Sequence, residues 1–454
     1  MAILFSVLSA TAEILRSLGF DIGPGTSSSA ALLMTLTAAA GMTSVGLYNR
    51  EHFVHMRHTI ARAVVAIPLI VLGIAAVLGG YGWLAGKAPP THYYLLCAAG
   101  LSAFFPLLLV AREIFIRIID HLGAFRRRVV VIGSGARAAK IDKLSRELKD
   151  RSFTVVGFIH LDRNGEQAAQ NERRTGDRRQ DYLVAPENVA DFCISNNVGE
   201  VVVAATERRG LPVHELLACK MNGIRVTEHH SFWERESGQV DLTDIRPSWL
   251  LFSDGFSTGF TRAAVKRLFD MVVAAVVLLL TLPITIPTAI LIKLESPGPV
   301  FYRQERVGLH GRRFMILKFR SMRVDAEKDG PRWAAKNDSR VTRMGGFIRK
   351  VRIDEIPQVI NVLKGDMSVV GPRPERPIFV EALAQAIPYY NDRHTVKPGI
   401  TGWAQINYPY GATEEDARMK MAYDLYYVKN HSLFLDNIIL LQTVKVLLWN
   451  DGAR

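Results

Sequence analysis

The chain has 454 residues, enough for about two or three domains, and 49% of them are hydrophobic. The apolar residues are grouped in blocks, which indicates membrane segments and argues against a purely water-soluble protein. The three cysteines, Cys97, Cys193 and Cys219, have no metal-ligand spacing and form no even disulfide framework. The net charge of +13 favours an anionic partner: a membrane surface, a nucleic acid or a phosphorylated substrate.

Apolar segments at 3–20, 30–48, 63–86 and 93–111 predict a bundle of transmembrane helices within residues 1–118. The first segment carries Glu13 and Arg16, so a helix lying at the membrane surface is the alternative for it. No short apolar run ends in a small-residue cleavage site, so we expect no cleaved signal peptide. Arginines are concentrated in the loop 49–62 and after the last segment, which places these parts in the cytoplasm by the positive-inside rule. Four crossings with a cytoplasmic N-terminus follow if the first segment spans.

A soluble α/β domain, Rossmann-like in its pattern, is predicted for residues 126–250. Strand patterns occur at 128–132, 154–159 and 200–204, with a weaker one at 223–226, and a helical pattern runs to Lys149. The first turn holds Gly133 and Gly135 in the sequence G-x-G-x-x-A, which is typical of a nucleotide-binding turn. The acidic residue expected for a ribose is not evident, so a working nucleotide site and a degenerate or regulatory domain both stay open.

A second kind of membrane element is predicted at 266–294. Pro283 and Pro287 lie inside this apolar block, where proline removes a helical hydrogen bond and kinks the helix. Both flanks are basic, and a spanning helix would place one of them outside, against the positive-inside bias. We therefore predict a re-entrant helical hairpin with both flanks in the cytoplasm, the alternative being a kinked spanning helix.

The adjacent acids Asp354 and Glu355 precede a helical pattern at 356–363. Pro357 is tolerated only in the first turn of a helix, so we expect the helix to begin near Asp354, with Asp354 as its N-cap. Arginines just upstream would then lie beside a helix end that suits anions. The alternative is that Asp354 only caps the helix and Glu355 is solvated.

Two further cationic features flank the acid pair. Lys318, Arg320 and Arg323 form a compact cluster after the extended pattern 314–319, either as a solvated face or as a contact for lipid headgroups. Arg373 lies in the stiff sequence GPRP, where its planar guanidinium suits phosphate oxygens. The aromatic stretch 424–449 is predicted to lie at the membrane interface or in the core.

The order of these motifs resembles one known family. The blocks KRLFD, SPGPVFYRQERVG, KFRSM, RKVRIDEIPQ, GDMSVVGPRPE and KPGITGWAQ resemble the bacterial polyprenyl-phosphate sugar phosphotransferases, the monotopic phosphoglycosyl transferases. The resemblance is dense over residues 266–405 and implies a catalytic domain at 262–454 on the cytoplasmic face of the bacterial inner membrane. The front of the chain resembles the larger members, which carry four transmembrane helices and a Rossmann-like domain.

The resemblance also carries over to single positions. It implies that Asp354 is the nucleophile, that Glu355 helps to hold Mg²⁺, and that Pro283 breaks the re-entrant helix. The expected contacts to substrate phosphates are Arg349, Arg352, Arg373, Lys318 and Arg320. Arg352 replaces a residue type common in the family, so it is either a further phosphate contact or only a surface charge.

The implied reaction transfers a sugar-1-phosphate from a nucleotide diphosphate sugar, by family expectation a UDP-hexose, to undecaprenyl phosphate. It starts exopolysaccharide, capsule or O-antigen repeat units through a covalent phosphosugar on Asp354. Membrane lipids are further partners, a homodimer is allowed, and no nucleic acid is implied. The rival functions are a membrane-anchored nucleotide-sugar oxidoreductase or dehydratase with bound NAD(P), and a non-enzymatic scaffold for polysaccharide assembly.

Overall fold

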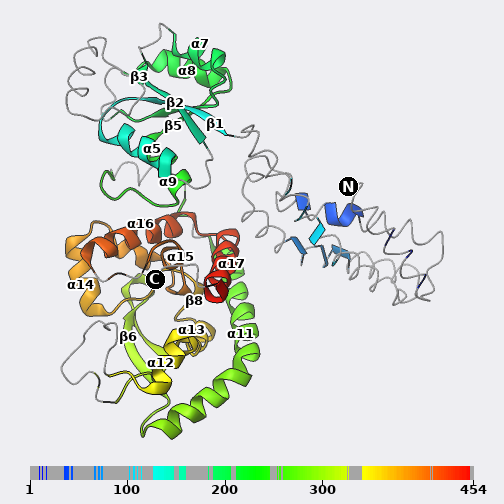
Figure 1. Cartoon of the computed structure of the whole chain (residues 1–454), viewed down its shortest axis with the longest axis vertical. Coiled ribbons are helices and arrows are strands. Elements are labelled where there is room, and N and C mark those ends of the chain that lie inside the picture. The colour runs from blue at the N-terminus through cyan, green and yellow to red at the C-terminus, as the bar shows by residue number, and fades with distance from the viewer. Residues whose placement is uncertain are drawn as a thin grey trace. The chain divides into compact units, whose positions relative to one another are not determined.

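Figure 1 shows the computed structural model of the chain. It describes residues 126–147, 153–159, 182–183, 188–205, 211–245, 259–324, 340–409 and 413–449, with scattered single positions elsewhere. The contacts divide the chain into two compact units, Met1–Glu228 and His229–Arg454. The helices predicted within residues 1–118 lie outside the described residues except for isolated positions.

The described part of the first unit contains a parallel five-stranded sheet with the order β3-β2-β1-β4-β5. Its strands are β1 (Arg127–Ile132), β2 (Phe153–Ile159), β3 (Tyr182–Leu183), β4 (Glu200–Val203) and β5 (Arg225–Glu228). The chain runs outward from β1 to β2 and β3, then returns to the other side of β1 to form β4 and β5. This reversal is typical of doubly wound α/β sheets. The apolar runs in β1 and β4 are buried because helices cover a parallel sheet.

Helices α5 (Ala136–Glu147), α7 (Val189–Ser195) and α8 (Val213–Met221) connect these strands. Cys193 and Cys219, from α7 and α8, share a core cluster with Val130 and Ile132 of β1. Both thiols are free and buried. The predicted parallel α/β sheet is therefore confirmed. The strand predicted at 223–226 begins two residues later, at Arg225. The sequence analysis did not predict β3, α7 or α8.

The second unit packs short helices and strands against one side of a long helix. In chain order these are α9 (His229–Ser237), α11 (Phe260–Glu295), β6 (Phe301–Val307), β7 (Arg313–Phe319), α12 (Arg343–Lys350), η3 (Ile353–Glu355), α13 (Gln358–Lys364), β8 (Ser368–Val370), α14 (Pro377–Ala386), η4 (Tyr390–Thr395), β9 (Gly399–Thr401), α15 (Trp403–Asn407), α16 (Glu414–Asn430) and α17 (Leu433–Trp449). β6 and β7 form an antiparallel hairpin, and β8 pairs in parallel with β9.

Helix α11 is the one helix in the described part of the chain that is long and apolar enough to cross a membrane. It is one continuous helix that bends along its length (Figure 1), with Pro283 and Pro287 inside it. The chain therefore does not divide into two separate helices at Pro283, and the re-entrant course in the membrane stays a prediction. A proline removes one hydrogen bond and pushes the preceding turn aside, which a helix can absorb by bending. The Thr281 hydroxyl donates to the Val277 carbonyl at 2.7 Å, a contact that also favours bending.

One side of α11 belongs to the core of the second unit. Ala274 is 1% exposed and packs in a cluster with Val359 of α13, Tyr427 of α16 and Ile439 of α17. Large apolar side chains elsewhere on the helix are exposed, among them Val272, Leu279, Leu280, Ile286, Ile290 and Leu294. The helix therefore contributes to the protein core and to an apolar outer surface at the same time.

Buried polar contacts attach the start of α11 to its neighbours. Asp270, 2% exposed, accepts hydrogen bonds from the Ser368 hydroxyl (2.9 Å) and the Val369 amide (3.1 Å) of β8. Lys266 lies 3.0 Å from the same carboxylate and 2.9 Å from Asp436 of α17. Because these charges are paired inside the unit, α11 is held to β8 and α17 by directional contacts as well as by packing.

Candidate active site

The acid pair lies in the turn η3, between α12 and α13. Arg352 has a φ of 61°, a left-handed conformation that ends α12 and starts a separate 3-10 turn. Pro357 takes the N-cap position, and α13 begins at Gln358. The prediction that Asp354 caps this helix is therefore wrong, because the turn at Arg352 sets the acid pair apart from the helix that follows.

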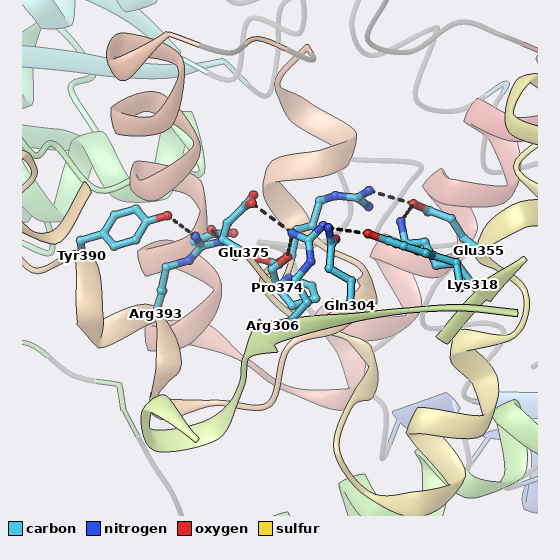
Figure 2. Close-up of polar contacts among 11 residues, drawn as sticks. Gln304, Arg306, Lys318, Glu355, Pro374, Glu375, Tyr390 and Arg393 are labelled. Carbon is cyan, nitrogen blue, oxygen red and sulfur yellow. Dashed lines mark hydrogen bonds and ion pairs between the residues drawn. The ribbon is translucent and has the colours of Figure 1, made fainter. Parts of the chain in front are cut away.

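Glu355 is held between two cations from distant parts of the chain (Figure 2). Its Oε1 accepts a hydrogen bond from Nζ of Lys318, on β7, and from Nη2 of Arg373, after β8, each at 2.8 Å. Its side chain is 13% exposed. Burial raises the pKa of Glu355, but the charges of Arg373 and Lys318 outweigh burial and hold that pKa well below its usual range. Glu355 is therefore ionised, and its position is set by both cations.

The pKa of Asp354 is shifted in the opposite direction from that of Glu355. Burial and the neighbouring charge of Glu355 raise its pKa, while Lys318, Arg352 and Arg349 lower it, and the net shift is upward. The structure thus gathers three of the predicted phosphate contacts around Asp354 and attaches the fourth, Arg373, to Glu355. The result is a half-buried carboxylate with raised proton affinity that lies among cations, an arrangement suited to an anionic substrate.

Arg320 is not brought to the acid pair. Its guanidinium, in a side chain 5% exposed, donates to the carbonyl oxygens of Ser296 and Pro297, each at 2.8 Å. These carbonyls directly follow α11, so Arg320 satisfies the acceptors that a helix end leaves without helical partners. Arg320 therefore holds the end of α11, and the structure gives no support to its predicted contact with phosphate.

Two glycine loops fix the backbone around Arg373. The Gly371 amide donates to the Thr401 carbonyl, and the Gly399 amide donates to the Pro372 carbonyl, each at 2.9 Å. A Cβ atom on Gly371 or Gly399 would collide with the backbone of the opposite loop. Only glycine permits this approach, so the two stiff loops predicted from the sequence lie against each other and support Arg373.

Two arginines that the sequence analysis did not single out, the partly buried Arg306 and the buried Arg393, extend this support (Figure 2). Nη1 of Arg306 donates to the Pro374 carbonyl (2.9 Å), and Nη2 donates to Oε1 of Gln304 (2.6 Å). Arg393 donates to the Arg373 carbonyl (2.9 Å). An alternating-strand pattern at 301–307 is a signal that could have placed Gln304 and Arg306 near one another, but Arg393 has no comparable local signal.

The turn after β1 in the first unit also requires glycine. Gly133 has a φ of 122°, and a Cβ atom there would collide with the backbone of Ala204 and Ala205. Gly135 has a φ of 81°, and a Cβ atom there would meet nothing within 4 Å beyond its chain neighbours. The turn lies at the carboxyl end of β1, the edge at which doubly wound sheets bind ligands. Nucleotide binding by Gly133 and Gly135 stays a prediction.

Comparison with known proteins relates the second unit to one family. A sequence profile described as bacterial sugar transferase matches residues 261–450. The UDP-N-acetylgalactosamine-undecaprenyl-phosphate N-acetylgalactosaminephosphotransferase of Aeromonas hydrophila is 50% identical over 192 residues, which are 42% of this chain and 45% of that protein. The match thus spans less than half of this relative.

Two longer matches extend into the front of the chain. The UDP-glucose:undecaprenyl-phosphate glucose-1-phosphate transferase of Xanthomonas campestris pv. campestris is 34% identical over 356 residues, 75% of this chain and 71% of that protein. The protein of the same name from Escherichia coli (strain K12) is 45% identical over 328 residues, 71% of this chain and 68% of that protein.

Proposed function

We propose that this chain, which belongs to the membrane-associated bacterial sugar transferase family of undecaprenyl-phosphate sugar phosphotransferases, transfers a sugar-1-phosphate from a UDP-sugar to undecaprenyl phosphate. The reaction starts a polysaccharide repeat unit. The observation that carries the proposal is the cation-surrounded acid pair: Asp354 has a raised pKa, and Glu355 is fixed between Lys318 and Arg373.

The reaction proceeds in two displacements at phosphorus. The Asp354 carboxylate attacks the phosphorus that carries the sugar; an O–P bond forms, the bond to the bridging diphosphate oxygen breaks, and UMP leaves. A phosphate oxygen of undecaprenyl phosphate then attacks the same phosphorus and releases Asp354, giving undecaprenyl diphosphate-sugar. Because both substrates are anions, a covalent intermediate lets them use the site in turn.

The cations around the acid pair lower the cost of bringing two anions together. Arg349, Arg352 and Lys318 all act on the charge of Asp354, so they are placed to offset the charge that develops on the transferred phosphoryl oxygens. Arg373 is oriented by Glu355 and offers the planar fork that suits a diphosphate. Arg320 has no part in this set.

The donor set of the acid pair fits Mg²⁺. This ion binds one or two carboxylates together with substrate phosphate oxygens. Both cations contact Oε1 of Glu355, so Oε2 and the Asp354 carboxylate are the oxygen atoms that would hold the ion. When bound, Mg²⁺ supplies positive charge that stabilises the leaving UMP.

Helix α11 is the element that we propose brings the reaction to the membrane. Its flanks carry Arg262, Lys266 and Arg267 on one side and Lys293 and Arg303 on the other, and its outer surface is apolar. We infer that the bent helix enters the cytoplasmic leaflet of the inner membrane and returns, so that both basic flanks stay in the cytoplasm. Residues 1–118 are proposed to add four transmembrane helices. The Rossmann-like domain predicted for residues 126–250 is proposed to end at Glu228, because the contacts assign His229 and the residues after it to the second unit.

The test is UMP release by the full-length protein in nanodiscs with Mg²⁺, undecaprenyl phosphate and a panel of UDP-sugars. We expect release with one donor, its loss on chelation of Mg²⁺, and its loss in Asp354→Asn and Glu355→Gln. The exposed Arg323→Gln is the matched control and keeps wild-type release. Release that persists in Asp354→Asn would move the assignment to another nucleophile. No release from any donor, with NAD(P) turnover instead, would support the oxidoreductase.

A further inference from the structure

Three possible metal ligands converge at the start of the second unit, in a part of the fold that the proposed reaction does not use. His229 and His230 are the first two residues of α9, and Asp244 lies in the stretch that follows this helix. One ligand atom of each residue lies within 4.8 Å of the other two. His229 is 1% exposed and His230 is 8% exposed, while Asp244 is partly exposed.

We propose that His229, His230 and Asp244 bind a Zn²⁺ ion. Imidazole nitrogens with one carboxylate oxygen form a donor set that suits zinc, whereas Mg²⁺ prefers oxygen atoms alone. A tetrahedral Zn²⁺ with bonds of about 2.0–2.1 Å sets its ligand atoms roughly 3.4 Å apart. Small side-chain rotations would therefore close the three donors around the ion and leave a fourth position for water or another ligand.

The electrostatics of the cluster are compatible with a cation. The N-terminal end of a helix such as α9 carries partial positive charge, which would repel a cation. The negative charge of the Asp244 carboxylate offsets this repulsion. The nearest acid on α9 itself, Glu234, is already paired: its Oε2 lies 2.6 Å from Nζ of Lys429, and both side chains are buried. Asp244 is thus the carboxylate that this arrangement assigns to the ion.

The position of the cluster indicates a structural role. Between α9 and Asp244 the chain is already attached to α15 and α16, because Trp403 donates to the Gly238 carbonyl (2.7 Å) and the Val240 amide donates to the Ala422 carbonyl (3.0 Å). A metal ion would join the first turn of α9 to the end of this attached stretch. The ion would then connect the two ends of the stretch 229–244, which precedes the segment that leads into α11.

The experiment uses full-length protein in detergent, purified without a histidine tag. After chelation and dialysis, Zn²⁺ is added, excess ion is removed, and the bound metal is measured by mass spectrometry alongside the melting temperature. We expect stoichiometric Zn²⁺ and a melting temperature that rises with Zn²⁺ in the wild type. Both effects should disappear in His230→Asn and Asp244→Asn and persist in His214→Asn, a variant of an exposed histidine.

A further readout separates this site from the catalytic one. Mg²⁺-dependent UMP release of Asp244→Asn, measured well below its melting temperature, should stay at the wild-type level, which also shows that the variant is folded. If His230→Asn fails to fold, the partly exposed Asp244→Asn decides alone. The proposal is overturned if wild-type protein retains no Zn²⁺, or if folded Asp244→Asn binds as much Zn²⁺ as the wild type.

Discussion

Arg393 donates a hydrogen bond from Nη2 to the main-chain carbonyl oxygen of Arg373 at 2.9 Å, so one buried arginine fixes the backbone of another. Arg393 is itself held by Oδ2 of Asp424 (2.7 Å) and by the hydroxyl of Tyr390 (2.6 Å) (Figure 2). The Arg373 guanidinium in turn contacts Glu355. A continuous set of polar contacts therefore runs from α16 to the acid pair.

The first prediction concerns this set of contacts. Arg393→Lys keeps the charge beside Asp424 but replaces two separate donor nitrogens with one, which cannot reach Tyr390, Asp424 and the Arg373 carbonyl together, so Arg373 should shift. A displacement of about 1 Å in a positioning group costs on the order of 10²-fold in rate, and we expect a loss of kcat of that size. UMP release and the melting temperature measure it, with the exposed Asn391→Ala in the same element as control. A folded variant with wild-type kcat would show that Arg393 has only a structural role.

The second prediction concerns pH. Arg373 and Lys318 hold the pKa of Glu355 below its ordinary value of 4.5, so the folded state releases this proton more readily than the unfolded state. The resulting stabilisation is fully present above pH 4.5 and is lost as the pH falls towards the lower folded pKa. Glu355→Gln should therefore lose less stability than the wild type on acidification.

Thermal unfolding between pH 6 and pH 3 measures this difference. Glu381→Gln is the control, because its side chain is 70% exposed and a surface carboxylate contributes little. The interpretation would be refuted by parallel stability curves for the wild type and Glu355→Gln across this range.

The third prediction separates two arginines that the sequence places in one cluster. Arg320→Ala removes the donors that satisfy the carbonyls after α11, and buried charge-assisted hydrogen bonds of this kind contribute about 1.5–3 kcal/mol each. We expect a loss of roughly 2–4 kcal/mol of unfolding free energy, within the range for a broken buried network. Arg323→Ala, at an exposed position, should change it by less than about 0.5 kcal/mol. Denaturant unfolding in detergent compares them, and equal losses would contradict the assignment.

The fourth prediction uses two adjacent glycines in α12. A Cβ atom on Gly345 would collide with the backbone of Ser321, whereas the nearest atom to one on Gly346 is the Val341 side chain, at 4.0 Å. Gly345→Ala should destabilise the fold by about 1–3 kcal/mol through overpacking. Gly346→Ala should stabilise it by about 0.5–1 kcal/mol, because alanine favours a helix. Unfolding free energies of the two variants test this, and destabilisation by both would mean that α12 is displaced.

The sequence predicts elements well where the signal is local. The parallel strands, the extended stretch that contains Lys318 and the stiff loops around Arg373 follow from apolar runs and from glycine and proline. The N-cap assigned to Asp354 fails because a left-handed arginine at 352 has no sequence signature; such a conformation is usually read from glycine or asparagine. The two separate helices expected on either side of Pro283 are one continuous helix, because a proline can bend a helix without ending it.

The candidate site shows the same division between local and distant information. The acid pair and its nearby arginines are adjacent in sequence, so their gathering around Asp354 is predictable. Lys318 and Arg320 are two residues apart, yet Lys318 contacts Glu355 and Arg320 contacts the end of α11. What separates them is the segment each one faces in the folded chain. Arg393 reaches Asp424 over 31 positions, a distance at which a single sequence carries no pattern.

The placement of α11 has a consequence for how the protein can be handled. Ala274 and Asp270 lie on the same helix as the exposed apolar surface, and they are buried against β8, α13 and α17. Removing the helix to obtain a water-soluble enzyme would empty part of the core and would take Asp270 away from Ser368 and Lys266 away from Asp436. The anchor and the enzyme are thus one folding unit, and a soluble catalytic fragment cannot be produced by truncation at residue 295.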